Sequence, residues 1–303
     1  MKFLGTTTKK AVTCDKVEDP KILSGQLLNT KKSFRFKKYT HIRISEIDSF
    51  CPREYTLGFQ TNAAQKSFVD FPLQQQFDLG SAIHYWLQNR SKVFEIYGNW
   101  VCLACSKTRL TKYGTKYFGT KPQTKCLNCG ASYKATEYEE FYFRMDTPYR
   151  IVGKIDGVIK KDGVYRFVDF KSYWQQPKGG FPNGKDVAQL ASYVNFYNYV
   201  PEEDKFPVEI DTSTAYLHYI SKKFSYSESI LTYPVRKNKK LLDLITKKVV
   251  SFTKAVENNT VPEPLEPCIR AEWKSGRSTK CFLKDICKHK YQEGGEKCVI
   301  VKK

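Results

Sequence analysis

Long apolar segments are absent from this sequence. No stretch approaches the roughly 18 consecutive apolar residues that a membrane-spanning helix requires. The first residues, MKFLGTTTKKAVTC, also lack the sustained apolar core of a secretory signal peptide. We therefore expect a cytoplasmic protein that has no membrane partner.

Acidic residues are scarce relative to basic ones. The 303 residues include 51 Lys and Arg but only 31 Asp and Glu, which gives a formal net charge of +20 at pH 7. Such an excess attracts polyanions, and phosphate contacts supply most of the sequence-independent affinity for nucleic acid. A membrane surface is the competing polyanion, but neither a lipidation signal nor an apolar segment supports it. A charge that serves only solubility is the alternative.

Cysteine, by contrast, is plentiful, and eight of the ten cysteines fall into two groups. In a reducing compartment, cysteines at short spacings indicate metal ligands before disulfides. The first group is a pair of C-x-x-C motifs separated by twenty residues, formed by Cys102, Cys105, Cys126 and Cys129. Two such knuckles complete a tetrahedral site of four thiolates, which predicts zinc, with a rubredoxin-like iron as the alternative.

The segment between the two motifs, SKTRLTKYGTKYFGTKPQTK, is basic and carries interleaved tyrosines and a phenylalanine. This composition suits phosphate contact and base stacking, so it predicts a loop that grips DNA. A purely structural clip is the other interpretation. In either case the four thiolates leave no open coordination position for catalysis.

The periodicity along the chain predicts an α/β protein. Helical patterns cover 45–88, 186–200 and 239–256, and strand-like runs cover 149–159, 164–172 and 214–220. Their order indicates a central mixed sheet flanked by helices. The predicted divisions are a basic N-terminal arm (1–40), a helical part of the core domain (41–99), a zinc-ribbon insert (100–131), the rest of the core (132–260) and a Cys-rich C-terminal segment (261–303).

The clearest hairpin joins 149–159 to 164–172 through KKDG, whose Asp-Gly pair suits a tight turn. Alternate residues of a strand share a face, so Asp169 and Lys171 project together. If Asp156 on the partner strand faces the same side, two carboxylates and an ammonium converge. That group suits a hard divalent cation, which lowers the pKa of a bound water while the lysine orients that water.

These residues resemble the motif of the PD-(D/E)XK nucleases. Asp156 followed by Asp169-Phe170-Lys171 matches the family's pattern, here with Asp at the second acidic position. The resemblance implies a restriction-endonuclease-like core. It also implies that Asp156, Asp169 and the Phe170 carbonyl hold a divalent metal, and that Lys171 positions the nucleophile.

Two further motifs resemble the RecB-type exonucleases and their CRISPR-associated relatives. GSAIH places His84 four residues after Gly80 on a helix, as the metal-binding histidine of that group is placed. AQLASY supplies Gln189 and Tyr193, which match its Q-x-x-x-Y helix. The resemblance implies that His84 is a metal ligand and that Gln189 and Tyr193 contact the active site or the DNA. Imidazole makes Mn²⁺ as well as Mg²⁺ a candidate.

Each of these residues also has an ordinary structural interpretation. His84 alone would be a satisfied core histidine, and Asp169 with Lys171 would be an exposed ion pair that contributes little to stability. Gln189 and Tyr193 would be neighbours on a helix surface. The ordered set of motifs, rather than any one of them, favours the nuclease interpretation.

The second cysteine group consists of Cys51, Cys268, Cys281 and Cys287. CPREYTLGF and CFLKDIC resemble the segments with which the same relatives bind a [4Fe–4S] cluster, which implies that these four residues are cluster ligands. The sequence departs from that pattern because twelve residues separate Cys268 from Cys281, so Cys298 and His289 are substitute ligands. A second zinc site and free thiols are the alternatives, and Cys14 has no assigned partner.

The motifs together favour a metal-dependent DNA nuclease, an exonuclease on single-stranded or end-containing DNA, in replication, recombination or repair. A bacterial or phage-infected host cell is the expected setting. The alternatives are a non-catalytic nucleic-acid-binding module on a nuclease fold and a structure-specific endonuclease. The sequence contains no helicase P-loop, so we expect unwinding to come from a helicase or another replication or recombination protein.

Overall fold

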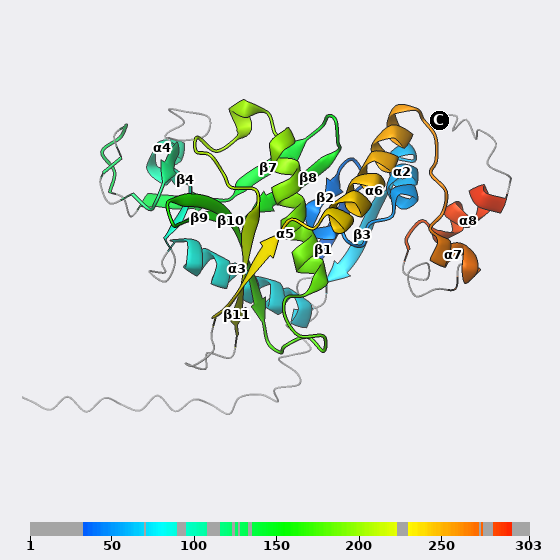
Figure 1. The fold of residues 1–303 in the computed structure, drawn as a ribbon, viewed down its shortest axis with the longest axis horizontal. Helices are drawn as coiled ribbons and strands as arrows, with labels where there is room; N and C mark the ends of the chain where they lie inside the picture. Colours follow the sequence, from blue (N-terminus) through cyan, green and yellow to red (C-terminus); the bar gives the residue numbers. More distant parts are fainter. Residues whose placement is uncertain are drawn as a thin grey trace, which may run out of the picture.

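The computed structural model describes residues 33–69, 71–89, 95–107, 116–122, 125, 126, 128–132, 135–222, 230–272, 274 and 281–292. Strands and helices alternate in this part of the chain, and the strands form three sheets flanked by helices (Figure 1). The predicted α/β class with a central mixed sheet is confirmed. None of the described helices is long and apolar enough to cross a membrane.

The largest sheet has seven strands in the order β12-β11-β10-β9-β4-β5, with β6 also paired to β4. Strands β10 and β11 run parallel, and the other pairs are antiparallel, so the sheet is mixed. The seven strands are β4 (Ile96–Cys102), β5 (Lys116–Gly119), β6 (Thr136–Glu139), β9 (Gly157–Lys161), β10 (Val164–Tyr173), β11 (Thr214–Ser221) and β12 (Ile230–Arg236).

A smaller sheet is connected to this one through a single residue that belongs to neither sheet. It contains β2 (Ile42–Arg43), β8 (Ile151–Ile155) and β7 (Phe141–Met145), in that order. Strand β8 ends at Ile155 and β9 begins at Gly157, so Asp156 alone joins these two strands. A separate antiparallel pair consists of β1 (Ser33–Lys38) and β3 (Ala64–Val69).

The predicted hairpin turn is confirmed between β9 and β10, but the run 149–159, predicted as one strand, is divided at Asp156 between β8 and β9. Its turn contains Asp162 and Gly163, both with positive φ, at 53° and 78°. Glycine tolerates that backbone region and aspartate is among the residues that adopt it most readily, so this sequence favours the turn. The turn fixes the register in which Val168 pairs with Gly157.

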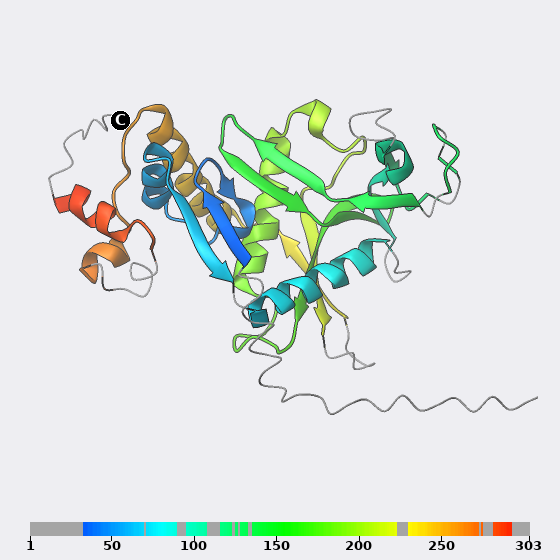
Figure 2. The ribbon, with the colours of Figure 1, turned by 180° about the vertical axis from the view of Figure 1, so that it is seen from behind.

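Two helices cover opposite faces of the large sheet, α5 (Gly184–Phe196) and α3 (Phe71–Asn89) (Figures 1 and 2). Successive residues of β10 point to these two sides. Phe167 belongs to the core cluster that contains the buried side chains of α5, whereas Val168 packs with Leu87 of α3. The odd-numbered side chains of β10 therefore point toward α5, and the even-numbered side chains point toward α3.

The remaining helices surround the main core. The helical spacing predicts that Leu241, Ile245, Val249 and Phe252 form the inner face of α6 (Lys239–Glu257). The last three are buried against α2 and α5, whereas Leu241 is only partly buried. The side chain of Asn238 accepts a hydrogen bond from Leu241 N and so caps the start of α6. The others are α2 (Pro52–Gln60), α4 (Leu103–Lys107), α7 (Glu266–Arg270), α8 (Lys284–Gln292) and the short 3-10 turns η1 (Ile44–Glu46), η3 (Tyr197–Tyr199) and η4 (Glu202–Asp204).

Two local predictions differ from the structure. The pattern at 45–88 predicts helix throughout, but residues 64–69 form strand β3, which pairs with β1. The predicted N-terminal arm therefore ends in an ordered strand, and Tyr39 just after it is 2% exposed. The helical pattern also places Trp86 near the inner stripe of α3, yet its side chain is 50% exposed and Leu87 occupies the core.

Arg53 fastens the C-terminal segment to α2. This buried side chain donates to Cys287 Sγ (3.2 Å), to the Cys287 carbonyl (3.4 Å) and to the Pro262 carbonyl (2.7 Å). Removing the guanidinium would leave these groups without their donor, and a hydrogen bond from a charged group contributes about 1.5–3 kcal/mol. One arginine therefore ties both Pro262 and Cys287 to α2.

We expect Arg53→Met to lower the free energy of unfolding by about 3 kcal/mol. Chemical denaturation followed by circular dichroism measures this change. Arg236→Met is the matched control, since Arg236 lies exposed on β12. Equal stability of the two variants would show that Arg53 does not hold the C-terminal segment.

Candidate active site and cysteine metal site

Asp156 and Asp169 face each other across the β9–β10 hairpin. Val168 pairs with Gly157, so Asp169 lies at the next register position, opposite Asp156. Both carboxylates are buried, and the Phe170 N–H donates a 2.6 Å hydrogen bond to Asp156 Oδ2. The strand turns from one sheet to the other at Asp156, which brings its side chain into this position.

Lys171 and Gln189 close a ring of polar contacts around Asp169. Lys171 Nζ lies 2.7 Å from Asp169 Oδ2 and donates to Gln189 Oε1 at 3.1 Å. Gln189 Nε2 in turn lies 3.4 Å from Asp169 Oδ1, as its donor. Asp169 and Lys171 share one face of β10, and Gln189 reaches them from α5, which covers that face.

His84 approaches Asp156 from α3. Its Nδ1 lies 3.4 Å from Asp156 Oδ1, and its ring meets Phe170 edge to face. Four residues further along α3, Gln88 Nε2 donates a 2.9 Å hydrogen bond to the Asp156 carbonyl. The structure thus brings together all four residues of the predicted set, His84, Asp156, Asp169 and Lys171.

The two carboxylates differ in their electrostatic surroundings. Burial raises the pKa of Asp169 to about 6, the charge of Asp156 adds to this, and Lys171 only partly opposes it. Burial also acts to raise the pKa of Asp156, but His84, Lys171 and the Phe170 N–H outweigh it and keep that pKa below its usual range. Burial disfavours the charged forms of His84 and Lys171, yet the neighbouring carboxylates raise the pKa of both. The cluster holds carboxylates whose repulsion a cation would relieve.

One acidic residue that the sequence motifs do not mark lies in the same cluster. Glu140, between β6 and β7, has a carboxylate oxygen within 4.8 Å of a ligand atom of His84 and of Asp156, which are themselves equally close. The segment YEEFYFRM contains two adjacent glutamates, and nothing in their local sequence distinguishes them. The register of β7 on β8 identifies Glu140 instead. Phe141 lies opposite Ile155, so the preceding residue, Glu140, lies beside Asp156.

Tyr193 is placed differently from Gln189. Its hydroxyl accepts from the Lys154 N–H at 3.0 Å and donates to the Lys154 carbonyl at 2.5 Å. The ring is 2% exposed and packs edge to face on Phe143. Tyr193 therefore ties α5 to the backbone of β8, two residues before Asp156.

We expect Tyr193→Phe to destabilise the fold by about 1–2 kcal/mol, because the N–H and carbonyl of Lys154 lose their partner, the buried Tyr193 hydroxyl. Thermal and chemical unfolding measure the loss. Tyr142→Phe is the control, since Tyr142 is 53% exposed. A stability loss no greater than that of the control would contradict the anchoring role of the Tyr193 hydroxyl.

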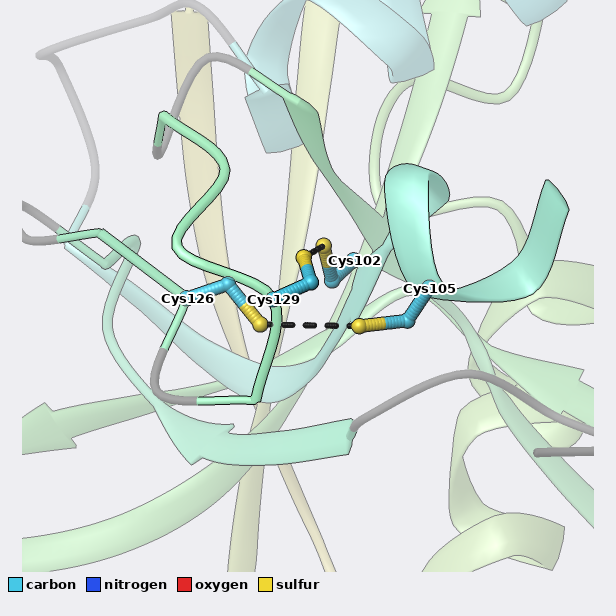
Figure 3. Close-up of side chains that lie close together, drawn as sticks. All are labelled: Cys102, Cys105, Cys126 and Cys129. Atoms are coloured by element: carbon cyan, nitrogen blue, oxygen red, sulfur yellow. Dashed lines mark hydrogen bonds between the residues drawn. The ribbon is translucent and has the colours of Figure 1, made fainter. Parts of the chain in front are cut away.

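The four cysteines of the C-x-x-C motifs meet at one point (Figure 3). Cys102 Sγ lies 3.7 Å from Cys129 Sγ, and Cys105 Sγ lies 3.6 Å from Cys126 Sγ. A zinc ion with Zn–S bonds of about 2.3 Å would place tetrahedral sulfurs about 3.8 Å apart, so the spacing fits zinc. Half of the basic segment 106–125, predicted to grip DNA, lies outside the described residues.

This cysteine site is an extension of the large sheet. Cys102 ends β4, which pairs with β9 at Ile96 and Tyr97, so β4 crosses the boundary predicted at residue 100. Strand β6 also holds α3, because Asn89 Oδ1 accepts from Tyr138 N at 2.8 Å. The ribbon formed by β4, β5 and β6 thus braces the helix that carries His84.

The second cysteine group lies at the opposite end of the molecule, where α7 and α8 pack near α2 (Figures 1 and 2). Cys51 precedes α2 and is buried, whereas the three other members are partly exposed: Cys268, Cys281 and Cys287. Burial raises the pKa of Cys281 to about 12, with added contributions from Glu54 and from Cys51 and Cys287. Cys14 and Cys298 lie outside the described residues, as does the side chain of His289.

The sequence profile of the PD-(D/E)XK nuclease superfamily matches residues 49–288, about four fifths of the chain. The match begins next to Cys51, ends after Cys287 and includes the cluster around Asp156. The sequence matches none of the curated proteins with which it was compared.

Three solved structures resemble this one at low identity. SSO0001 is 13% identical, with 89% of this chain and 94% of that chain covered and a TM-score of 0.34. LHK-Exo in complex with dAMP is 9% identical, with 73% and 90% covered and a TM-score of 0.38. The alkaline exonuclease LHK-Exo from Laribacter hongkongensis is 8% identical, with the same coverage and a TM-score of 0.37.

Proposed function

Because the chain belongs to the PD-(D/E)XK nuclease superfamily, we propose that it is a metal-dependent deoxyribonuclease that cleaves phosphodiester bonds. The observation that carries this proposal is the convergence of Asp156, Asp169 and Lys171 in one buried cluster, with His84 beside Asp156. A protein that only binds nucleic acid gains nothing from burying two carboxylates beside a partly buried lysine at such a cost in desolvation.

The residues present fit a divalent cation. Asp169 Oδ2 is buried and, although 2.7 Å from Lys171 Nζ, lies outside hydrogen-bonding geometry. We propose His84, Asp156, Asp169 and the Phe170 carbonyl as the groups that hold Mg²⁺ or Mn²⁺. The bound ion polarises a phosphoryl oxygen and lowers the pKa of a water.

Lys171 and Gln189 are proposed to orient the attacking water and the phosphate. The Lys171 ammonium is held between Asp169 and Gln189, so its direction is fixed before substrate arrives. The raised pKa of Lys171, which the carboxylates cause against the effect of burial, keeps it charged. A fixed positive charge beside a scissile phosphate stabilises the negative charge that develops there.

The proposed preference for DNA, and for single strands or ends, rests on the RecB-type motifs around His84 and Gln189. The net charge of +20 supports a polyanionic substrate. Since the 303 residues contain no P-loop, we propose that a helicase or another replication, recombination or repair protein supplies unwinding.

Zinc is the proposed occupant of the site formed by the two C-x-x-C motifs, because four thiolates at these spacings match its tetrahedral geometry. For the second group we propose a [4Fe–4S] cluster held by Cys51, Cys268, Cys281 and Cys287. A cluster spaces its ligand sulfurs more widely than a single ion, and these cysteines come from both ends of the matched region.

We expect Asp169→Ala and Lys171→Ala each to reduce DNA cleavage at least about 100-fold. Binding should change only slightly, because other basic groups supply most phosphate contacts. The assay uses 5′- and 3′-labelled single- and double-stranded DNA with Mg²⁺ or Mn²⁺. Lys160→Ala, an exposed lysine on β9, is the matched control.

The same assay distinguishes the alternatives. Wild-type cleavage by both active-site variants would rule out the assignment, and DNA binding without cleavage by the wild type would indicate a binding module. Release of single nucleotides from labelled ends supports an exonuclease. Internal cuts would instead indicate an endonuclease.

Metal content provides a separate test of the two cysteine groups. Anaerobically purified protein should contain one zinc and about four iron atoms per chain and should be brown. Cys287→Ala should remove the iron but keep the zinc, and Cys126→Ser should do the reverse, so each variant controls the other. Two zinc ions and no iron would replace the cluster with a second zinc site.

A further inference from the structure

Glu140 lies opposite Asp156 in the small sheet. Phe141 pairs with Ile155 in the antiparallel β7–β8 ladder, so Glu140 and Asp156 occupy the next position beyond that pair. Residues opposite each other in such a ladder have Cβ atoms about 4.5–5.5 Å apart and project to the same face. Asp156 therefore has an acidic neighbour on each side of the break between the sheets, Asp169 in β10 and Glu140 just before β7.

An acidic pair in this position needs compensation. Like charges directly opposite each other destabilise a sheet, and Asp156 is 7% exposed. His84 comes to the same point from α3, so that one ligand atom from each of the three side chains lies within 4.8 Å of the others. Two carboxylates and one imidazole make a donor set suited to a divalent transition-metal ion.

The competing explanation is an ion pair between Glu140 and Lys154. Lys154 Nζ lies 3.5 Å from Glu140 Oε2, and the lysine side chain is 62% exposed. Pairs of that exposure contribute little to stability. The ion pair therefore does not account for a glutamate placed against a buried aspartate and a histidine.

We propose that Glu140 is a further ligand of the divalent cation proposed above, on the side of His84 and Asp156. The inference deepens the proposed nuclease function and rests on it for the purpose of the cation. Asp156 contributes to both acidic pairs, one with Asp169 and one with Glu140. Glu140 adds a charge to the binding site from a segment outside the D…D-x-K motif, so it raises affinity for the cation without being part of the family pattern that Asp156, Asp169 and Lys171 match.

The test is Mn²⁺ binding in the absence of DNA, measured by calorimetric titration and electron paramagnetic resonance on the zinc-loaded full chain. We expect Glu140→Gln to raise the Mn²⁺ dissociation constant at least about tenfold, since loss even of an outer-sphere partner costs that much. Glu139→Gln removes the same charge one residue away and should leave the constant unchanged. Wild-type Mn²⁺ affinity in Glu140→Gln would overturn the proposal, as would a wild type that does not bind Mn²⁺.

Two further variants separate ligation from indirect effects. Lys154→Met removes the ion pair but keeps the carboxylate, so Mn²⁺ affinity should stay the same or increase. A loss equal to that of Glu140→Gln would mean that Glu140 acts only through Lys154 and would overturn the proposal. Glu140→Asp should recover part of the affinity, and its melting temperature, with that of Glu140→Gln, checks that the fold is intact.

The proposed function and this inference can fail separately. If the wild type cleaves DNA and Glu140→Gln binds Mn²⁺ normally, the nuclease function stands and Glu140 is not a ligand. If the wild type binds Mn²⁺ through Glu140 but does not cleave DNA, the metal position stands and the nuclease function fails.

Discussion

Asp156 is a buried carboxylate at the one residue that separates β8 from β9. A charge in this position is costly unless partners surround it, and the structure supplies them from β10 and from α3. The Phe170 N–H binds one oxygen, His84 approaches the other, and Gln88 holds the backbone carbonyl. The large sheet and α3 therefore meet around Asp156, at the point where the chain passes from the small sheet to the large one.

The same crowding supports the proposed cation site. Burial and the charge of Asp156 raise the pKa of Asp169 to about 6, whereas His84, Lys171 and the Phe170 N–H hold the pKa of Asp156 low against the effect of burial. Lys171 and His84 neutralise part of the negative charge, but each is itself held by the carboxylates that it compensates. A divalent ion would relieve the remaining repulsion without any rearrangement of the backbone. Preorganisation of this kind is what catalysis at a phosphate requires.

Local sequence patterns predicted the parts of this fold that depend on neighbours along the chain. Asp162-Gly163 marks the hairpin turn, and the spacing of Ile245, Val249 and Phe252 identifies the buried face of α6. Patterns failed where long-range pairing decides. Residues 64–69 form a strand only because β1 is beside them, and Trp86 is exposed because Leu87 faces β10. Sequence patterns did not mark Glu140 for the same reason. Its position beside Asp156 is set by the register of β7 on β8 and not by the residues next to it in the sequence.

The ribbon and the acidic cluster are connected through a single strand. Strand β6 begins at Thr136, which pairs with Cys102, and ends at Glu139, one residue before Glu140. Along the way the Tyr138 N–H binds Asn89, five residues after His84 in α3. An ion bound by the four cysteines would therefore stiffen the strand that delivers Glu140 and the helix that delivers His84. Four thiolates leave no open coordination position on such an ion, so its role at the proposed site would be to support Glu140 and His84 through β6.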